Sequence, residues 1–593
     1  MNILGISCYY HDSAAALIRD GILVACAQEE RFSRKKNDAG FPKNAIDFVL
    51  QQGNIKSSEI DYVAFYDKPF LKFERIIKSI LQSFPYSCRL FIEVMQTWFK
   101  DKLWIREEIS NYLKISSKKV MFIEHHISHA ASAFLCSPYE KAAIITVDGV
   151  GEWATTTIGI GDGTSIKLLQ EIHFPHSLGL LYSAFTAFLG FEVNEGEYKV
   201  MGMAPFGKPL YIDKVKKVIN LHKDGSFELN MDYFSFHYSI SKTYNKNFIK
   251  LFDKQRDANS KFFTRESGYP SYYGEKPTNY IELCKKNEYY ADIAASIQSV
   301  LEEALINLAN VAYEKTGLDK LCIAGGVGLN SSANYKILKK APFKEIYIQP
   351  ASGDAGGAIG AALYIYNNIV NNKRIFIMDN AYYGKEYKIN EIKNAIEHSG
   401  FSYKIINDEE KLIKHVVNLL IQGKVVGWYQ GRFEWGPRAL GCRSIIADAR
   451  IAKMKDIVNT KIKFREPFRP FAPSVLDKHY QDYFEIDSSK EHYPAKFMLY
   501  VVPIKENKRK EIPAVTHVDG TGRLQIVEKD KNPLYWELIN TFYKETSTPL
   551  ILNTSFNLKG EPIVNTPANA LNTFTKSQMD ALVMGQFLIE AKR

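Results

Sequence analysis

Residues 142–170 read AAIITVDGVGEWATTTIGIGDGTSIKLLQ, three apolar strands joined by two turns. The second turn is Asp-Gly between apolar runs, which is a strong signal for a hairpin. Residues 2–28, NILGISCYYHDSAAALIRDGILVACAQ, repeat the order of strand, small-residue turn, strand, Asp-Gly turn and strand. Two such units predict a duplicated α/β domain with a cleft between its halves, and the loop after each first strand faces that cleft.

The chain between residues 170 and 370 extends this pattern. Residues 289–316 carry apolar side chains at helical spacing, and Gly317 follows as a C-cap. Two further strands, at 321–324 and 345–350, each lead into a glycine-rich loop. The stretch of about 207–285 is polar, aromatic-rich and irregular, which indicates an insertion.

A second α/β domain is expected at 383–593, separated by a linker at 371–382 from the first domain at 1–370. Its predicted elements are a helix at 388–398, strands at 424–429 and 549–553, a helix that Thr566 caps with Pro567 at its first position, and a last strand, ALVMGQFLI.

Length and composition limit the class of protein. A chain of 593 residues exceeds the size of a single core, so we expect at least two domains. No apolar run approaches ~20 residues and no export signal is present, so we expect a cytoplasmic protein without a membrane span. Seven dispersed cysteines without a C-x-x-C pair favour a reducing compartment and argue against structural zinc. A net charge of +10 is modest for this length and favours solvated loops or a phosphate substrate over a nucleic-acid partner.

The segment MFIEHHISHAASAF at 121–134 predicts a helix with His125 and His129 on one face. Asp148 ends the strand AAIITV, and Asp354 lies in the loop ASGDAGGAIG. Two nitrogen and two oxygen ligands suit Fe, Mn or Zn rather than a thiolate site. The alternative is that the two histidines are ordinary polar residues on an alanine-rich helix.

His11 lies in the first loop that faces the predicted cleft. An imidazole titrates near neutral pH, so His11 fits a general base beside the metal. The alternative is a capping or structural role in the turn HDSAA.

Two glycine loops, GGVGLN and SGDAGGAIG, each follow an apolar strand and precede a helix. Glycine allows backbone N–H groups to approach phosphate oxygens, and a helix N-terminus favours an anion; tight turns are the alternative. The candidate nucleotide-binding residues in these loops and in GEYKVMGMAPFG are Glu197, Lys199, Gly325, Gly326, Asn330 and Gly353.

The second domain carries basic residues in loops rich in glycine and proline. Arginine offers forked donors to phosphate or carboxylate, and lysine offers a point charge. A surface or salt-bridge role is the alternative for any one of them. The candidate anion-binding residues are Arg438, Arg443, Lys463, Arg465, Arg523, Asn553 and Ser555.

Taken together, these motifs resemble those of the O-carbamoyltransferases of nodulation and antibiotic biosynthesis. The matching strings run in order over nearly the whole chain, with gaps mainly at 70–115, 210–280 and 370–420. They are GISCYYHDSAAAL, AQEERFSRKK, HHISHAASAF, VDGVGEWATT, GEYKVMGMAPFG, AGGVGLN, SGDAGGAIGAA, FEWGPRALGCRSI, KFREPFRPFAP, HVDGTGRLQ and LNTSFNLKGEPIV.

The resemblance implies an N-terminal duplicated actin/Hsp70-like ATPase fold, of the threonylcarbamoyl-transfer type, and a C-terminal YrdC-like domain. It implies that the C-terminal domain makes carbamoyl adenylate from carbamoyl phosphate and Mg-bound ATP. The carbamoyl group then passes to an acceptor hydroxyl at a metal site, which in a studied relative contains iron. By motif, Arg438, Arg443, Lys463, Arg523, Asn553 and Ser555 bind the two substrates, His125, His129, Asp148 and Asp354 hold the metal, and His11 deprotonates the hydroxyl.

Three other functional classes share related domains or folds. A small-molecule kinase of the actin/Hsp70-like superfamily would not explain the separate basic loops. A nucleotide-switch protein would need neither His11 nor the metal set. A hydrogenase-maturation carbamoyltransferase is expected to carry C-x-x-C zinc motifs, which this chain lacks. A small-molecule or glycan acceptor is expected, and its identity, like a homodimeric state, stays open.

Overall fold

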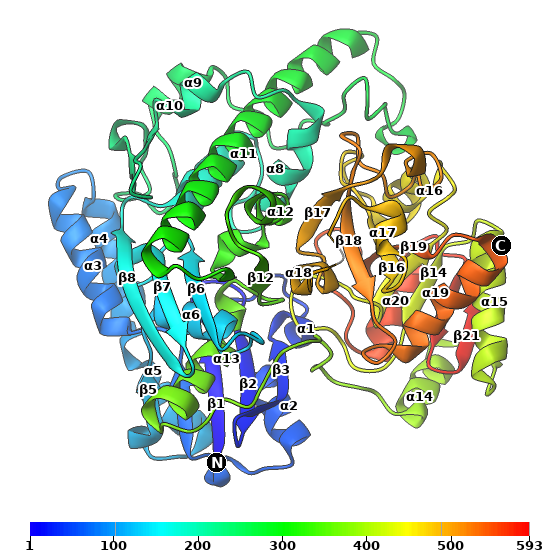
Figure 1. Ribbon diagram of the computed structural model, residues 1–593, viewed down its shortest axis with the longest axis horizontal. Coiled ribbons are helices and arrows are strands. Elements are labelled where there is room, and N and C mark those ends of the chain that lie inside the picture. The colour runs from blue at the N-terminus through cyan, green and yellow to red at the C-terminus, as the bar shows by residue number, and fades with distance from the viewer. Residues whose placement is uncertain (101, 488, 592–593) are drawn as a thin grey trace. The chain divides into compact units, whose positions relative to one another are not determined.

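The computed structural model describes residues 1–100, 102–487 and 489–591 (Figure 1). The chain forms two compact units. The first comprises residues 1–29, 37–260 and 290–379, and the second comprises residues 30–36, 261–289 and 380–593. No helix in the described part of the chain has the length and apolar character needed to span a bilayer.

The first unit contains two five-stranded sheets of the same topology, ordered β3-β2-β1-β4-β5 and β8-β7-β6-β11-β12. In each sheet the first strand of the half pairs antiparallel with the second strand and parallel with the fourth. This repeated order confirms the duplicated α/β fold of the actin/Hsp70-like type. The strands are β1 (Asn2–Ser7), β2 (Ala14–Arg19), β3 (Ile22–Gln28), β4 (Tyr62–Phe65), β5 (Val120–Phe122), β6 (Lys141–Val147), β7 (Ala154–Asp162), β8 (Ser165–His173), β11 (Lys320–Ala324) and β12 (Glu345–Ile348).

Equivalent helices follow the last strand of each half. Helix α6 (His125–Phe134) comes after β5, and α13 (Asp354–Tyr364) comes after β12. The two helices pack against each other (Figure 1). Their backbones approach closely at Gly360, where a Cβ atom would lie 1.9 Å from the carbonyl oxygen of Ser128. Glycine is therefore required at this crossing.

Along the chain, the remaining helices of the first unit connect the strands within each half. They include α2 (Lys43–Gly53), α3 (Pro69–Gln82), α4 (Cys88–Lys100), α5 (Ile105–Leu113), α7 (Leu178–Phe188), α8 (Glu197–Met203), α10 (Lys246–Phe252) and α12 (Ser331–Lys340).

Two predictions for the region 207–285 need correction. Helix α11 (Tyr280–Thr316) begins before the predicted residue 289, because the added turns contain good helix formers even though they lack an apolar stripe. The region also contains α10 and a hairpin, β9 (Ile219–Leu221) and β10 (Phe227–Leu229), so it is less irregular than predicted. The sequence marks this hairpin with Asp224-Gly225 between its strands.

The second unit is built on one nine-stranded mixed sheet, ordered β13-β21-β20-β14-β15-β19-β16-β18-β17. The strands are β13 (Lys404–Ile405), β14 (Val426–Tyr429), β15 (Arg443–Ala447), β16 (Ala472–Leu476), β17 (Tyr500–Pro503), β18 (Thr521–Val527), β19 (Leu550–Ser555), β20 (Ala581–Met584) and β21 (Phe587–Glu590). The longer helices are α14 (Ile389–Ser399), α15 (Glu409–Ile421), α19 (Pro533–Thr546) and α20 (Pro567–Lys576).

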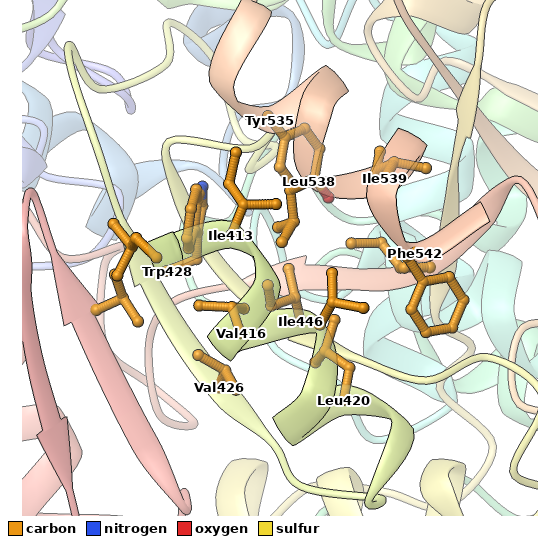
Figure 2. Packing of buried hydrophobic residues seen from close by; sticks show 14 of the residues in the cluster. Ile413, Val416, Leu420, Val426, Trp428, Ile446, Tyr535, Leu538, Ile539 and Phe542 are labelled. Atoms are coloured by element: carbon orange, nitrogen blue, oxygen red, sulfur yellow. The ribbon is translucent and has the colours of Figure 1, made fainter. Parts of the chain in front are cut away.

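The core of the second unit lies between this sheet and helices α15 and α19 (Figure 2). Both helices present one apolar face to the central strands, as amphipathic helices do. The buried side chains at this interface include Ile413, Val416, Leu420, Val426, Trp428, Ile446, Leu538, Ile539 and Phe542.

The last predicted strand is wrong in one respect. ALVMGQFLI forms two antiparallel strands, β20 and β21, with Met584 paired to Phe587. Gly585 between them has a φ of 56°, the left-handed region that favours glycine. The apolar run therefore turns back at this glycine and does not continue as one strand. The predicted cap of α20 is confirmed, since the Thr566 side chain accepts a hydrogen bond from the Asn569 N–H.

We expect Gly360→Ala to destabilise the first unit by about 1–3 kcal/mol, because α6 and α13 must separate to admit the methyl group. The measurement is the unfolding midpoint in urea. The control is Gly40→Ala, whose Cβ meets only the Asp38 Oδ1 atom, at 3.2 Å. An unchanged midpoint for Gly360→Ala would contradict the close crossing of the two helices.

Candidate active site

The two predicted histidines meet at the start of α6. The Nε2 atoms of His125 and His129 lie 3.0 Å apart, and both side chains are buried. This arrangement follows from their spacing of four residues, which places both on one helix face. His126 points elsewhere, since its Nδ1 atom hydrogen-bonds with Thr146 Oγ1 at 2.6 Å.

Two carboxylates complete this group. Asp148 directly follows β6, and one of its oxygens lies 3.3 Å from His125 Nε2. Asp354 is the first residue of α13, and its Oδ1 atom lies 3.7 Å from the Nε2 atoms of both His125 and His129. One ligand atom from each of the four residues lies within 4.8 Å of the other three, and all four residues are buried. The structure thus brings together all four predicted metal ligands.

The chemistry of this group fits a divalent cation. Asp354 Oδ1 is buried and has no hydrogen-bond partner in the described part of the chain. A buried carboxylate oxygen without a partner carries a large desolvation cost, which a cation removes. Two imidazole nitrogens and two carboxylates form a mixed nitrogen and oxygen set that suits Fe, Mn or Zn.

Protonation of the four residues agrees with metal binding. Burial lowers the pKa of both His125 and His129, which keeps the imidazoles neutral, as ligands must be. Burial opposes ionisation of Asp148, but its contacts with the two histidines hold its pKa well below the usual range. Burial and the nearby Asp148 carboxylate raise the pKa of Asp354 to about 7, although His11 opposes the shift. Two buried carboxylates repel each other, and a cation between them relieves that repulsion.

Three groups support the four residues: Tyr66 and Glu152, which the sequence did not predict, and the N–H of Gly326, a candidate nucleotide-binding residue. The Tyr66 hydroxyl donates to Asp354 Oδ2 at 3.3 Å, and the Gly326 N–H donates to Asp148 Oδ1 at 2.8 Å. The backbone N–H of His125, at the start of α6, donates to both carboxylate oxygens of Glu152, each at 3.1 Å. Glu152 stands in the matching string VDGVGEWATT, which is the one sequence signal that marks it.

His11 lies in the loop between β1 and β2, and its Nδ1 atom is 3.1 Å from Asp12 Oδ2. Burial alone would lower the pKa of His11. The carboxylates of Asp354, Asp12 and Asp148 nevertheless raise it to about 10, so two of the predicted metal ligands act electrostatically on the imidazole. The role of His11 as a general base beside the metal stays a prediction.

The candidate nucleotide-binding residues are only partly brought to this site. Gly325 packs against the end of β6, since a Cβ atom on it would lie 2.2 Å from the Val147 carbonyl oxygen. Gly353 lies next to Gly326, since a Cβ atom on it would lie 3.9 Å from Gly326 Cα. These three glycines therefore lie near Asp148, which follows β6. Asn330 instead caps α12 by accepting from the Ala333 N–H at 3.1 Å.

Glu197 and Lys199 lie on α8 and have local contacts. Glu197 Oε1 accepts from the Ser183 hydroxyl at 2.8 Å, and the Lys199 ammonium lies 5.6 Å from the centre of the Phe191 ring. Their role in nucleotide binding stays a prediction.

The basic residues of the second unit gather at the ends of strands. The Lys463 ammonium is buried and donates to the Ser555 carbonyl and to Asn557 Oδ1. Burial and the nearby Arg465 and Arg469 hold the pKa of Lys463 well below its usual range. Lys463 and Ser555 are thus neighbours, as their motifs imply.

Arg523 on β18 belongs to the same positive region. Burial and the nearby guanidinium groups of Arg438, Arg465 and Arg469 together hold the pKa of Arg523 well below its usual range. Such a group of guanidinium ions favours a polyanionic ligand.

Arg443 and Asn553 mainly support the loops. The Arg443 guanidinium donates to the carbonyl oxygens of Gln430 and Gly431 at 2.6 and 3.1 Å and stacks on Tyr429. The Asn553 amide donates to the Ala439 carbonyl at 3.1 Å, while its buried Oδ1 has no partner.

Two further buried residues of the second unit, Glu434 and Arg31, are not marked by any sequence pattern as candidate site residues. Glu434 is buried, and its Oε1 accepts from the Leu440 and Cys442 N–H groups at 2.8 and 2.7 Å. Arg31 comes from the N-terminal string AQEERFSRKK, and its Nη2 donates to the Gly436 carbonyl at 2.7 Å. Its Nε and Nη1 atoms are buried and have no hydrogen-bond partner. Pattern analysis could not assign residues 30–36 to the second unit, because the contacts span about 400 residues of chain.

Comparison with known proteins gives a consistent result. A model described as "Carbamoyltransferase N-terminus" matches residues 2–363, and one described as "Carbamoyltransferase C-terminus" matches residues 417–591. Nodulation protein NolNO of Sinorhizobium fredii is 35% identical over 98% of this chain and 79% of its own length. Nodulation protein U of Rhizobium tropici is 27% identical over 94% of this chain and 91% of its own length. An uncharacterised protein of Synechocystis sp. is 44% identical over 99% of this chain and 96% of its own length.

We expect the purified chain to retain a single divalent ion after dialysis, and His129→Ala to lower its metal affinity more than about tenfold, because one buried ligand is lost. The measurement is metal content by mass spectrometry. The control is His126→Gln, which changes the neighbouring imidazole that bonds with Thr146 instead. Equal metal content in His129→Ala and the unchanged protein would contradict the assigned ligands.

Proposed function

The chain belongs to the carbamoyltransferase family and is a carbamoyltransferase, and we propose that it transfers a carbamoyl group to a hydroxyl acceptor in two steps. In the first step, water cleaves carbamoyl phosphate in the second unit to carbamate and phosphate. A carbamate oxygen then attacks the α-phosphorus of ATP, which gives carbamoyl adenylate and releases pyrophosphate. In the second step, the acceptor hydroxyl attacks the carbamoyl carbon in the first unit and AMP leaves. The observation that carries this proposal is the buried group of His125, His129, Asp148 and Asp354 beside His11.

The four residues of this group would hold a divalent metal, for which iron, manganese and zinc are the candidates. When bound, the metal supplies positive charge that stabilises the negative charge developing on the phosphate of the departing AMP. The chain keeps the ligands ready for it. Tyr66 and Gly326 orient the two carboxylates, and Glu152 fixes the start of the helix that carries both histidines.

His11 is the proposed general base for the acceptor hydroxyl. A base must be neutral before it accepts a proton, and the uncompensated carboxylates raise the pKa of His11 to about 10. Neutralising Asp148 and Asp354 removes the main cause of that rise and brings His11 back toward its ordinary range. Asp12, bonded to Nδ1 at 3.1 Å, then holds the ring so that Nε2 is free to receive the proton.

The second unit fits the adenylate-forming step. Carbamoyl phosphate and ATP are both polyanions, and Arg438, Arg465, Arg469 and Arg523 create a region with excess positive charge. Lys463 lies buried beside Ser555 within the same set. Binding of phosphate groups here relieves repulsion among the cations and holds the two substrates together for the first step.

We expect the full chain, supplied with carbamoyl phosphate, Mg²⁺ and ATP, to produce AMP and pyrophosphate. The products are separated by anion-exchange chromatography, with omission of carbamoyl phosphate as the control. ADP as the main product would contradict the proposal and indicate a kinase.

We expect His11→Asn to leave pyrophosphate release within about twofold of the unchanged protein while transfer to the acceptor falls by about 10²–10⁴-fold, the usual contribution of a general base. Loss of both steps together would contradict the division between the two units.

We expect Lys463→Ala to abolish most pyrophosphate release, because it removes a buried ammonium from the substrate site. The control is Lys461→Ala, an exposed lysine two positions earlier. If both variants behave alike, Lys463 has no specific role in adenylate formation.

A further inference from the structure

Arg75 on α3 is a buried cation whose hydrogen-bonding capacity is not fully used. Its exposed fraction is 6%, and its Nε and Nη1 atoms have no hydrogen-bond partner among the residues that the structure describes. Burial lowers the pKa of Arg75 to about 10, yet this value leaves the guanidinium charged at neutral pH. A buried charge with unused donors is costly unless an anion meets it.

The acidic groups around Arg75 are already engaged. Asp67 and Glu152 both attract the guanidinium electrostatically. Asp67 Oδ2, however, accepts from the Lys72 ammonium at 2.8 Å. Glu152 accepts from the backbone N–H groups of Lys68, at 2.8 Å, and of His125, at 3.1 Å. Neither carboxylate bonds to Arg75, whereas Lys72, one turn earlier on the same helix, has a full ion pair.

Phe174 fixes the orientation of the guanidinium. The Arg75 Cζ atom lies 4.9 Å from the centre of the Phe174 ring, a cation–π contact. Stacking covers one face of the planar group and leaves its edge donors for a ligand. Phe174 in turn packs edge-on against Phe236, with ring centres 6.2 Å apart. The guanidinium is therefore held in place before any ligand arrives.

Arg75 lies in the same half of the duplicated unit as His11, the proposed base. The Lys72 ammonium, one turn earlier on α3, lies 5.4 Å from the centre of the Tyr10 ring, and the Tyr10 ring lies 4.9 Å from the ring of His11. Arg75 and Tyr10 also interact electrostatically. The base must contact the hydroxyl that it deprotonates. The glycine loops at Gly325 and Gly353 belong to the other half of the duplicated unit.

We propose that Arg75 binds an anionic group, a carboxylate or a phosphate, on the hydroxyl acceptor. The acceptor class is then an acidic sugar or a phosphorylated hydroxyl compound. That the bound anion belongs to an acceptor rests on the proposed function. The anion site itself is defined by Arg75, Phe174 and the two carboxylates, Asp67 and Glu152, that already have other partners. Arg75 is a specificity residue in this scheme, since it selects the acceptor and takes no part in the bond changes.

The test is calorimetric titration of the metal-loaded full chain with galactose, galacturonate and galactose 6-phosphate. We expect at least one of the two anionic sugars to bind about tenfold or more tightly than galactose, as a buried charge-assisted contact requires. Arg75→Met should reduce this preference to about twofold or less, and Arg75→Lys should keep part of it. The contrast between galacturonate and galactose 6-phosphate tells which anion is preferred.

The control is Lys78→Met, which removes one charge from the exposed part of the same helix, where Lys78 pairs with Glu74. It should leave the preference unchanged. The proposal is overturned if neither anionic sugar binds more tightly than galactose, or if the preference survives Arg75→Met. It is also overturned if Arg75→Met weakens the binding of AMP and spares the sugars, since Arg75 would then contact the adenylate phosphate. The titration measures binding and does not depend on turnover. Failure of the proposed two-step reaction would instead be seen as the absence of pyrophosphate in the product assay.

Discussion

Two carboxylates and two imidazoles buried within one small volume impose the main constraint on the first unit. Asp148 and Asp354 repel each other where water cannot screen them, and their ligand atoms converge within 4.8 Å with those of His125 and His129. A cation bound among them would relieve this repulsion. The close crossing of α6 and α13, which depends on Gly360, keeps these side chains together. Metal binding, packing of the two helices and the state of His11 are therefore coupled.

Duplication explains how this group is assembled. The two histidines open the helix after the last strand of the first half, and Asp354 opens the equivalent helix of the second half. Asp148 and His11 lie in the loops after the equivalent first strands, β6 and β1. Each half thus contributes the same two positions, a first-strand loop and a helix start. The catalytic asymmetry comes from which side chains occupy them.

Much of this could be predicted from the sequence. The repeated order of strands and Asp-Gly turns in residues 2–28 and 142–170 predicts the two equivalent sheets. The four-residue spacing of His125 and His129 predicts that both lie on one face of a helix. Tyr66, Glu152 and Arg75 could not be found in this way, because a hydrogen bond or stacking contact between distant segments leaves no local periodicity. The assignment of residues 30–36 to the second unit has the same cause. The turn at Gly585 was missed because an apolar run without a polar turn residue resembles one strand.

We propose that the four buried residues form one metal site in the first unit. Anomalous diffraction from crystals of the metal-loaded chain, collected on both sides of the absorption edge of the bound metal, tests it most directly. We expect a single strong anomalous peak in contact with the Nε2 atoms of His125 and His129 and with a carboxylate oxygen of each of Asp148 and Asp354. A peak elsewhere in the chain, or the same four side chains well ordered around no peak at saturating metal, would contradict it.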